Sequence, residues 1–183
     1  LFASGANSLL DITSGTTVSG GGVVKIGNGV AHIGGTGSET VVFVSNGSGG
    51  LEIDDNAANT SAYSGTISGL GGVSHSNHKQ YIDLADVSFA SNTISGTFSG
   101  GVLEVKSGGT DVADIKLAGA YVTSDFKFTS GAGDTVKITD PFGSIAGGAV
   151  TTLASTANNN PSPAGFTGGG NVALLGSYMA SLF

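Results

Sequence analysis

Two groups of residues in this sequence carry side chains that could bind a metal ion. His75 and His78 form the segment HSNH in a Gly- and Ser-rich stretch, a spacing that places two imidazoles on one metal if a turn forms there. Asp54, Asp55 and Asn56 lie in EIDDNAAN and offer the oxygen ligands that calcium prefers. We therefore expect no cofactor, with calcium at Asp54 to Asn56 as the candidate exception.

Both groups also have an ordinary structural interpretation. A solvated loop accounts for the histidines, because the chain has no Cys and Asp83 is the nearest carboxylate. The spacing of an EF-hand is absent, and Asx turns that end a strand account for Asp54 to Asn56. A similar choice exists at Asp83 and Asp86 in IDLADVS, where we predict a short helical turn capped by one aspartate.

The sequence lacks the patterns of the common enzyme classes. It has no GxSxG segment, and neither His32 nor the pair His75 and His78 has an evident acid partner for a serine hydrolase. The phosphate-binding patterns GxGxxG and GxxxxGK[ST] are also absent. All six basic residues are lysines, so no guanidinium is present to clamp a phosphate or carboxylate. We expect a protein that is not an enzyme.

The charge balance bears on the partners. The net charge of −7 disfavours nucleic-acid binding, which relies on basic side chains that neutralise phosphates. No run approaches the roughly 18 apolar residues that span a bilayer, so no transmembrane segment is expected.

The elements that would position these residues are short strands. Gly contributes 33 residues and Pro only 3, which favours many tight turns. The apolar pieces LLDI, TTVS, VVKI, VAHI and VVFV follow one another too closely for crossover helices. We predict an all-β fold whose residues 1–49 are β-solenoid-like, although hairpins could use the same short pieces.

The rest of the chain divides into two further predicted segments. Residues 50–141 contain longer strands in which Lys116 and Lys137 alternate with apolar neighbours, a period of two that places the lysines on a solvated face. We predict a β-roll or sandwich-like module there. Residues 142–183 are rich in Gly, Ser and Asn, and we expect a loosely structured extension.

An internal repeat connects the last two segments. IKLAGAYVTSDF (115–126) aligns with VALLGSYMASLF (172–183), with five identical positions in twelve. The first copy predicts a strand, a Gly turn, a short helical turn and a strand that begins at Phe126. The second copy stops at Phe183, so we expect either that the chain is truncated there or that its end is completed by another subunit. The residues that we expect to take part in assembly are Leu1, Phe2, Tyr178, Met179, Leu182 and Phe183.

Several segments resemble a Gly-rich repeat of large secreted alphaproteobacterial proteins, described as adhesin-like, autotransporter-like or RTX-like. They are GTISGLGG (65–72), YIDLADVSFAS (81–91), the run from SGGVLEV to KITDP (99–141) and NVALLGSYMASLF, roughly half of the chain. The resemblance implies an extracellular or cell-surface bacterial protein exported by a type I or autotransporter-like route. The ending MASLF also resembles type I secretion signals, or could be a strand donated to a neighbour.

One departure from RTX proteins matters for calcium. Their GGxGxDxUx nonapeptide is absent, and its near match GGTGSETVV (34–42) has Glu39 where the aspartate belongs. We therefore do not expect the calcium-binding β-roll of that family in this chain.

Together these observations favour an extracellular structural protein, a subunit of a self-assembling filament or surface layer that forms homo-oligomers through its chain ends. The alternative is a glycan- or matrix-binding adhesin domain of a large secreted protein. A third hypothesis is an extracellular enzyme that acts on polysaccharide, which would need a cleft with several convergent acids.

Overall fold

The computed structural model describes residues 1–13, 21–34, 37–54, 63–72, 77–89 and 93–140. The chain forms two compact units, Leu1–Gly148 and Ala149–Phe183, and every described residue belongs to the first. The predicted strand TTVS, the extension at 142–183 and the second copy of the repeat lie outside the described residues.

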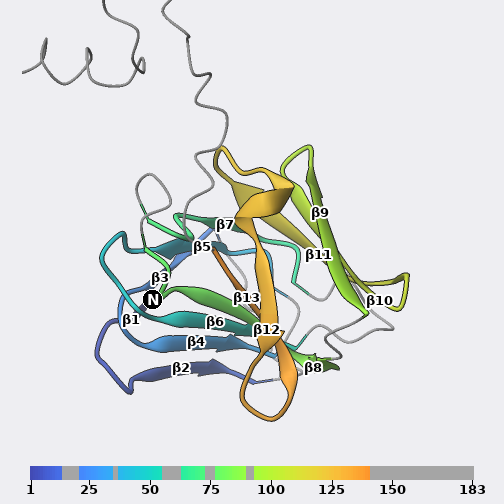
Figure 1. The fold of residues 1–183 in the computed structure, drawn as a ribbon. Coiled ribbons are helices and arrows are strands. Elements are labelled where there is room, and N and C mark those ends of the chain that lie inside the picture. Colours follow the sequence, from blue (N-terminus) through green and yellow to red (C-terminus); the bar gives the residue numbers. More distant parts are fainter. Residues whose placement is uncertain (14–20, 35–36, 55–62, 73–76, 90–92, 141–183) are drawn as a thin grey trace, which may run out of the picture. The chain divides into compact units, whose positions relative to one another are not determined.

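The described residues form two mixed β-sheets (Figure 1). Sheet A contains, in spatial order, β1 (Phe2–Ala3), β3 (Val23–Ile26), β5 (Thr40–Phe43), β7 (Thr66–Ser68), β11 (Thr110–Ala118), β10 (Val102–Ser107) and β9 (Ile94–Ser99). Sheet B contains β12 (Lys127–Ser130), β13 (Thr135–Thr139), β8 (Tyr81–Ser88), β6 (Gly50–Ile53), β4 (Val30–Ile33) and β2 (Leu9–Ile12). The all-β prediction is confirmed.

The strands from β1 to β8 wind in successive turns of two strands each. Consecutive strands alternate between the sheets, and each of β1 to β6 pairs in parallel with the strand two places later in the chain. We call these eight strands the parallel coil. Hairpins would pair consecutive strands in antiparallel fashion, so they do not account for this part of the chain. Both sheets run on without a break past residue 49, where we expected one segment to end.

Antiparallel strands extend both sheets beyond the coil. In sheet A, β11 pairs in parallel with β7 and then leads through antiparallel pairs to β10 and β9. In sheet B, β13 pairs antiparallel with β8 and with β12. The 3₁₀-helix η2 (Thr123–Asp125) connects the sheets, which confirms the helical turn predicted before Phe126.

The helical turn predicted at Asp83 and Asp86 is wrong. Both residues lie within β8, the second longest strand of the described residues. At Asp83 this strand pairs with β6 on one side and with β13 on the other, whereas Asp86 lies in an irregular stretch of β8 that is in register with neither strand. At Asp83, sheet pairing on both sides therefore overrides the local capping preference of aspartate.

A single hydrophobic core lies between the sheets, and strand alternation fills it. In β3, Val24 and Ile26 are buried while Val23 and Lys25 are exposed. The same alternation exposes Lys116 in β11, as predicted. Alternate residues of the coil's strands thus face the core, and the residues between them face outward.

Glycines make the stacking of the coil's turns possible. The segment from Gly27 to Gly29 joins β3 to β4, and the next turn lies directly on it: the Gly49 amide donates to the Gly27 carbonyl at 2.9 Å. The amide nitrogen of Ser48 likewise donates to the Asn28 side-chain oxygen at 3.1 Å. A Cβ on Gly49 would run into the carbonyl oxygens of Gly29 and Gly27. Only a residue without a side chain fits there.

We expect Gly49→Ala to lower the free energy of unfolding by about 3 kcal/mol, at the upper end of overpacking effects, because the obstacle is backbone. Gly22→Ala is the control, since nothing lies within 4 Å of its Cβ position. Its effect should stay within about 0.5 kcal/mol. Denaturant unfolding measures both, and equal stabilities would contradict the stacking argument.

Candidate functional site

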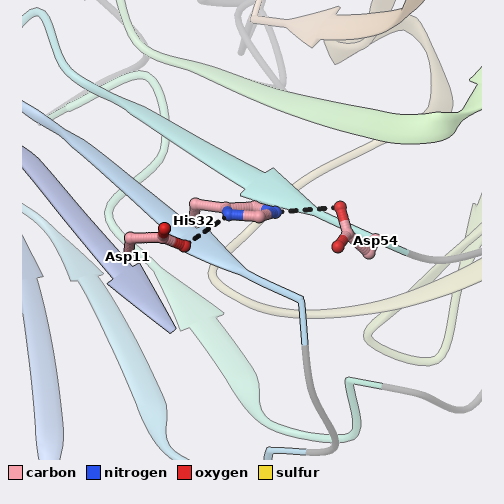
Figure 2. A network of polar contacts seen from close by, with 3 residues as sticks. All are labelled: Asp11, His32 and Asp54. Carbon is pink, nitrogen blue, oxygen red and sulfur yellow. Dashed lines mark hydrogen bonds and ion pairs between the residues drawn. The ribbon is translucent and has the colours of Figure 1, made fainter. Parts of the chain in front are cut away.

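A histidine between two carboxylates lies on the outer face of sheet B (Figure 2). His32 Nδ1 lies 2.7 Å from Asp11 Oδ1, and His32 Nε2 lies 2.9 Å from Asp54 Oδ1. The residues come from β2, from β4 and from the position directly after β6. The cluster, which we call the His32 clasp, therefore connects three successive turns of the parallel coil.

The register of the coil brings these residues together. Asp11 and His32 are paired positions of β2 and β4, and His32 is paired with Glu52 of β6. All three face outward, because the next residue of each strand is a buried isoleucine. Asp54 follows that isoleucine in β6 and reaches the ring from the side opposite Asp11.

The geometry favours a charged imidazole. A neutral histidine can donate from one ring nitrogen only, whereas two carboxylate acceptors require a proton on both. Burial lowers the pKa of His32, but the hydrogen bonds to Asp54 and to Asp11 and their negative charges outweigh it, so the pKa is raised above 6.5. In this state neither ring nitrogen has a lone pair for a metal or for a proton-transfer step.

The sequence interpretation of His32 was wrong, because the residue has two acid partners rather than none. The partners lie 21 and 22 residues from His32, and Leu9 pairs with Val30 at the same separation of 21. That separation is the length of the turn between β2 and β4, but other turns of the coil differ from it, so no regular spacing in the sequence pointed to these partners.

The metal predictions fall partly within the described residues. The Oδ1 atom of Asp54 is bonded to His32, while Asp55 and Asn56 lie outside the described residues. His78 Nδ1 donates to the Asp140 backbone carbonyl at 2.8 Å, and His75 again lies outside. Within the described ranges no three His, Asp or Glu side chains gather as a metal-holding group. Calcium at Asp54 to Asn56 stays a prediction.

Glu39, the residue that departs from the nonapeptide pattern, is buried. The residue is 3% exposed, and among the described residues neither carboxylate oxygen has a hydrogen-bond partner. The Tyr63 hydroxyl donates to its backbone carbonyl at 2.7 Å, and burial together with the Glu39 charge raises the pKa of Tyr63. A buried, unpartnered carboxylate is costly in its charged form.

A second feature of the same end of the coil is a sheet edge that no described strand covers. β1 ends sheet A and β2 ends sheet B, and no described strand pairs with their outer sides. We call these two strands the N-terminal edge. Leu1, Phe2 and Leu9 are 65%, 58% and 61% exposed, the highest values among the large apolar residues described. The predicted assembly residues Leu1 and Phe2 lie on this edge; Tyr178, Met179, Leu182 and Phe183 lie outside the described residues.

Comparison with protein-family models, with curated proteins and with solved structures found no match to this chain. The resemblance to RTX-like repeats therefore stays a prediction that rests on the quoted segments. Among the described residues, none of the helices is long and apolar enough to cross a membrane.

We expect the stability of the protein to fall as the pH rises from 6.5 through the folded-state pKa of His32. The folded pKa is raised, so the clasp contributes fully below pH 6.5 and is lost as the imidazolium deprotonates. His32→Gln should cost about 2 kcal/mol at pH 5.5, by loss of hydrogen bonds to charged groups. Unfolding of both proteins across pH 5 to 9 tests this, and a constant difference between them would contradict it.

We expect Glu39→Gln to raise the free energy of unfolding at pH 7 by about 1 kcal/mol, because an amide costs less to bury than a carboxylate for which the described residues offer no hydrogen-bond partner. Glu104→Gln is the matched control: its carboxylate is partly exposed and bonds Lys106 at 2.8 Å, so stability should fall slightly. Thermal unfolding shows whether each substitution raises or lowers the stability of the protein. If Glu39→Gln lowers the stability instead, the carboxylate of Glu39 stabilises the fold and this prediction is wrong.

Proposed function

We propose that this chain is an extracellular structural protein, a subunit of a self-assembling filament or surface layer, and that it assembles through the N-terminal edge. The observation that carries the proposal is that both sheets end together, at one end of the coil, in strands that have a described neighbour on one side only. Outward N–H and C=O groups that no described strand pairs form a template for further strands.

The side chains at the edge support the same proposal. Isolated exposed apolar residues are ordinary, but Leu1, Phe2 and Leu9 all belong to the last layer of one coil. Pairing by another β layer would extend both sheets and withdraw these side chains from water. Successive turns of the coil already stack through parallel strand pairing, and assembly through this edge would add further strands to the same two sheets.

The extracellular location is supported by composition and by the resemblance stated above. The chain has no Cys and no Arg, and few of its residues are charged. Export from a bacterium by a type I or autotransporter-like route is part of the proposal. Outside the cell the protein would meet calcium ions, for which Asp54 to Asn56 are the candidate ligands.

We expect the purified chain to form ordered fibres or lattices under the electron microscope, and Leu9→Lys to abolish them, because a charge on β2 opposes edge pairing. Val122→Lys is the matched control: it also replaces an exposed apolar residue, but one that lies between β11 and η2. If all three proteins stay dispersed as single particles, self-assembly is wrong. A chain that lacks residues 178–183 tests the predicted assembly residues at the other terminus.

A further inference from the structure

The last described residue, Asp140, is joined in the sequence to Pro141. This is the one Asp–Pro step of the chain, since its other two prolines follow Asn160 and Ser162. An aspartate oxygen can attack the main-chain carbonyl carbon of its own residue, because the two close a five-membered ring. A following proline favours this route, since it has no N–H to attack the side chain instead and it leaves as a secondary amine. The bond is therefore one that the side chain of Asp140 can break.

The fold places a hydrogen-bond donor on the carbonyl group of this bond. His78 Nδ1 lies 2.8 Å from the Asp140 carbonyl oxygen, and because a carbonyl only accepts, that nitrogen carries the proton. His78 lies just before β8, Asp140 directly follows β13, and the pairing of Thr139 with Tyr81 brings both to one end of sheet B. A donor in this position stabilises the negative charge that forms on the oxygen when the carbonyl carbon is attacked.

The carboxylate of Asp140 is held in the interior. The residue is 1% exposed and continues the alternation of β13, in which Ile138 faces the core. Its Oδ2 atom lies against Gly71, so that an added Cβ on this glycine would run into it. The Tyr121 hydroxyl donates to the carbonyl oxygen of Leu70 at 2.9 Å and fixes the same turn. Little water therefore has to leave the carboxylate before it attacks.

We propose that the folded chain cleaves its own Asp140–Pro141 bond, with His78 as the catalytic donor. The Asp140 carboxylate oxygen forms a bond to the Asp140 carbonyl carbon, and the displaced electron pair moves onto the carbonyl oxygen, which His78 stabilises. When that pair returns, the carbon–nitrogen bond to Pro141 breaks, and the nitrogen takes a proton from solvent water. The cyclic anhydride left at Asp140 then adds water and opens to two carboxyl groups. The net reaction is the hydrolysis of one peptide bond.

The cut would divide the chain beside its last described strand. Every described strand ends before Asp140, so residues 1–140 would keep both sheets. The piece 141–183 would begin with Pro141 and would carry the assembly residues predicted between 178 and 183. This inference is independent of the proposed function, because neither its residues nor its chemistry involve the N-terminal edge.

Mass spectrometry of the purified, intact chain tests the proposal. During incubation in mildly acidic buffer, we expect the pieces 1–140 and 141–183 to accumulate about tenfold faster from the folded chain than from the chain unfolded in guanidinium chloride at the same pH. The unfolded chain has the same Asp–Pro step without the donor from His78, so it measures the ordinary lability of the bond. Equal or slower cleavage of the folded chain would overturn the proposal.

Three variants test the individual roles, and circular dichroism checks that each one folds. Pro141→Ala removes the leaving group, and we expect no cut after residue 140. His78→Ala removes the donor and should slow cleavage about tenfold, whereas His78→Asn keeps an N–H donor and should restore most of the rate. The proposal is wrong if Pro141→Ala is still cut there, or if His78→Ala is cut as fast as the unchanged chain. A slowing that His78→Asn does not relieve would make the histidine a structural residue and overturn its catalytic role.

Discussion

Close stacking of successive turns is the constraint on which the rest of this structure depends. Parallel strands lie about 4.8 Å apart, so the connections between them must follow one another at the same spacing. Gly27, Gly47 and Gly49 lie where adjacent connections touch, and an added Cβ at Gly47 or Gly49 would meet a carbonyl oxygen of the turn before it. The large Gly content of the chain is therefore a packing requirement of the coil as well as a source of turns.

Short-range sequence signals predict much of this fold. VVKI and VAHI were identified as strands with the bounds that the structure has, because their alternation and the flanking Gly residues are both short-range signals. The repeat beginning at Ile115 predicted the strand, the turn and η2 for the same reason. Where the apolar pattern has a period of two and turn residues lie close by, the sequence is sufficient.

The His32 clasp was not predictable in this way. Its three residues belong to different turns, and they meet only because β2, β4 and β6 pair in one particular register. That register is a property of the whole coil, whose turns differ in length between the strands. The error at Asp83 has a related origin: two neighbouring strands, far away in the sequence, decide the conformation of β8. Local preferences cannot reveal partners of this kind.

The order of the sheets gives the folding of this chain a direction. The hairpin of β12 and β13 and the meander of β9, β10 and β11 close between neighbours in sequence, so little loop entropy opposes their formation. Every turn of the coil, in contrast, has a template only once the turn beside it exists. We therefore expect growth of the sheets from the antiparallel end toward β1 and β2. In that order the edge that we propose for docking forms last, and a subunit becomes competent to associate only after the remainder of its sheets is complete.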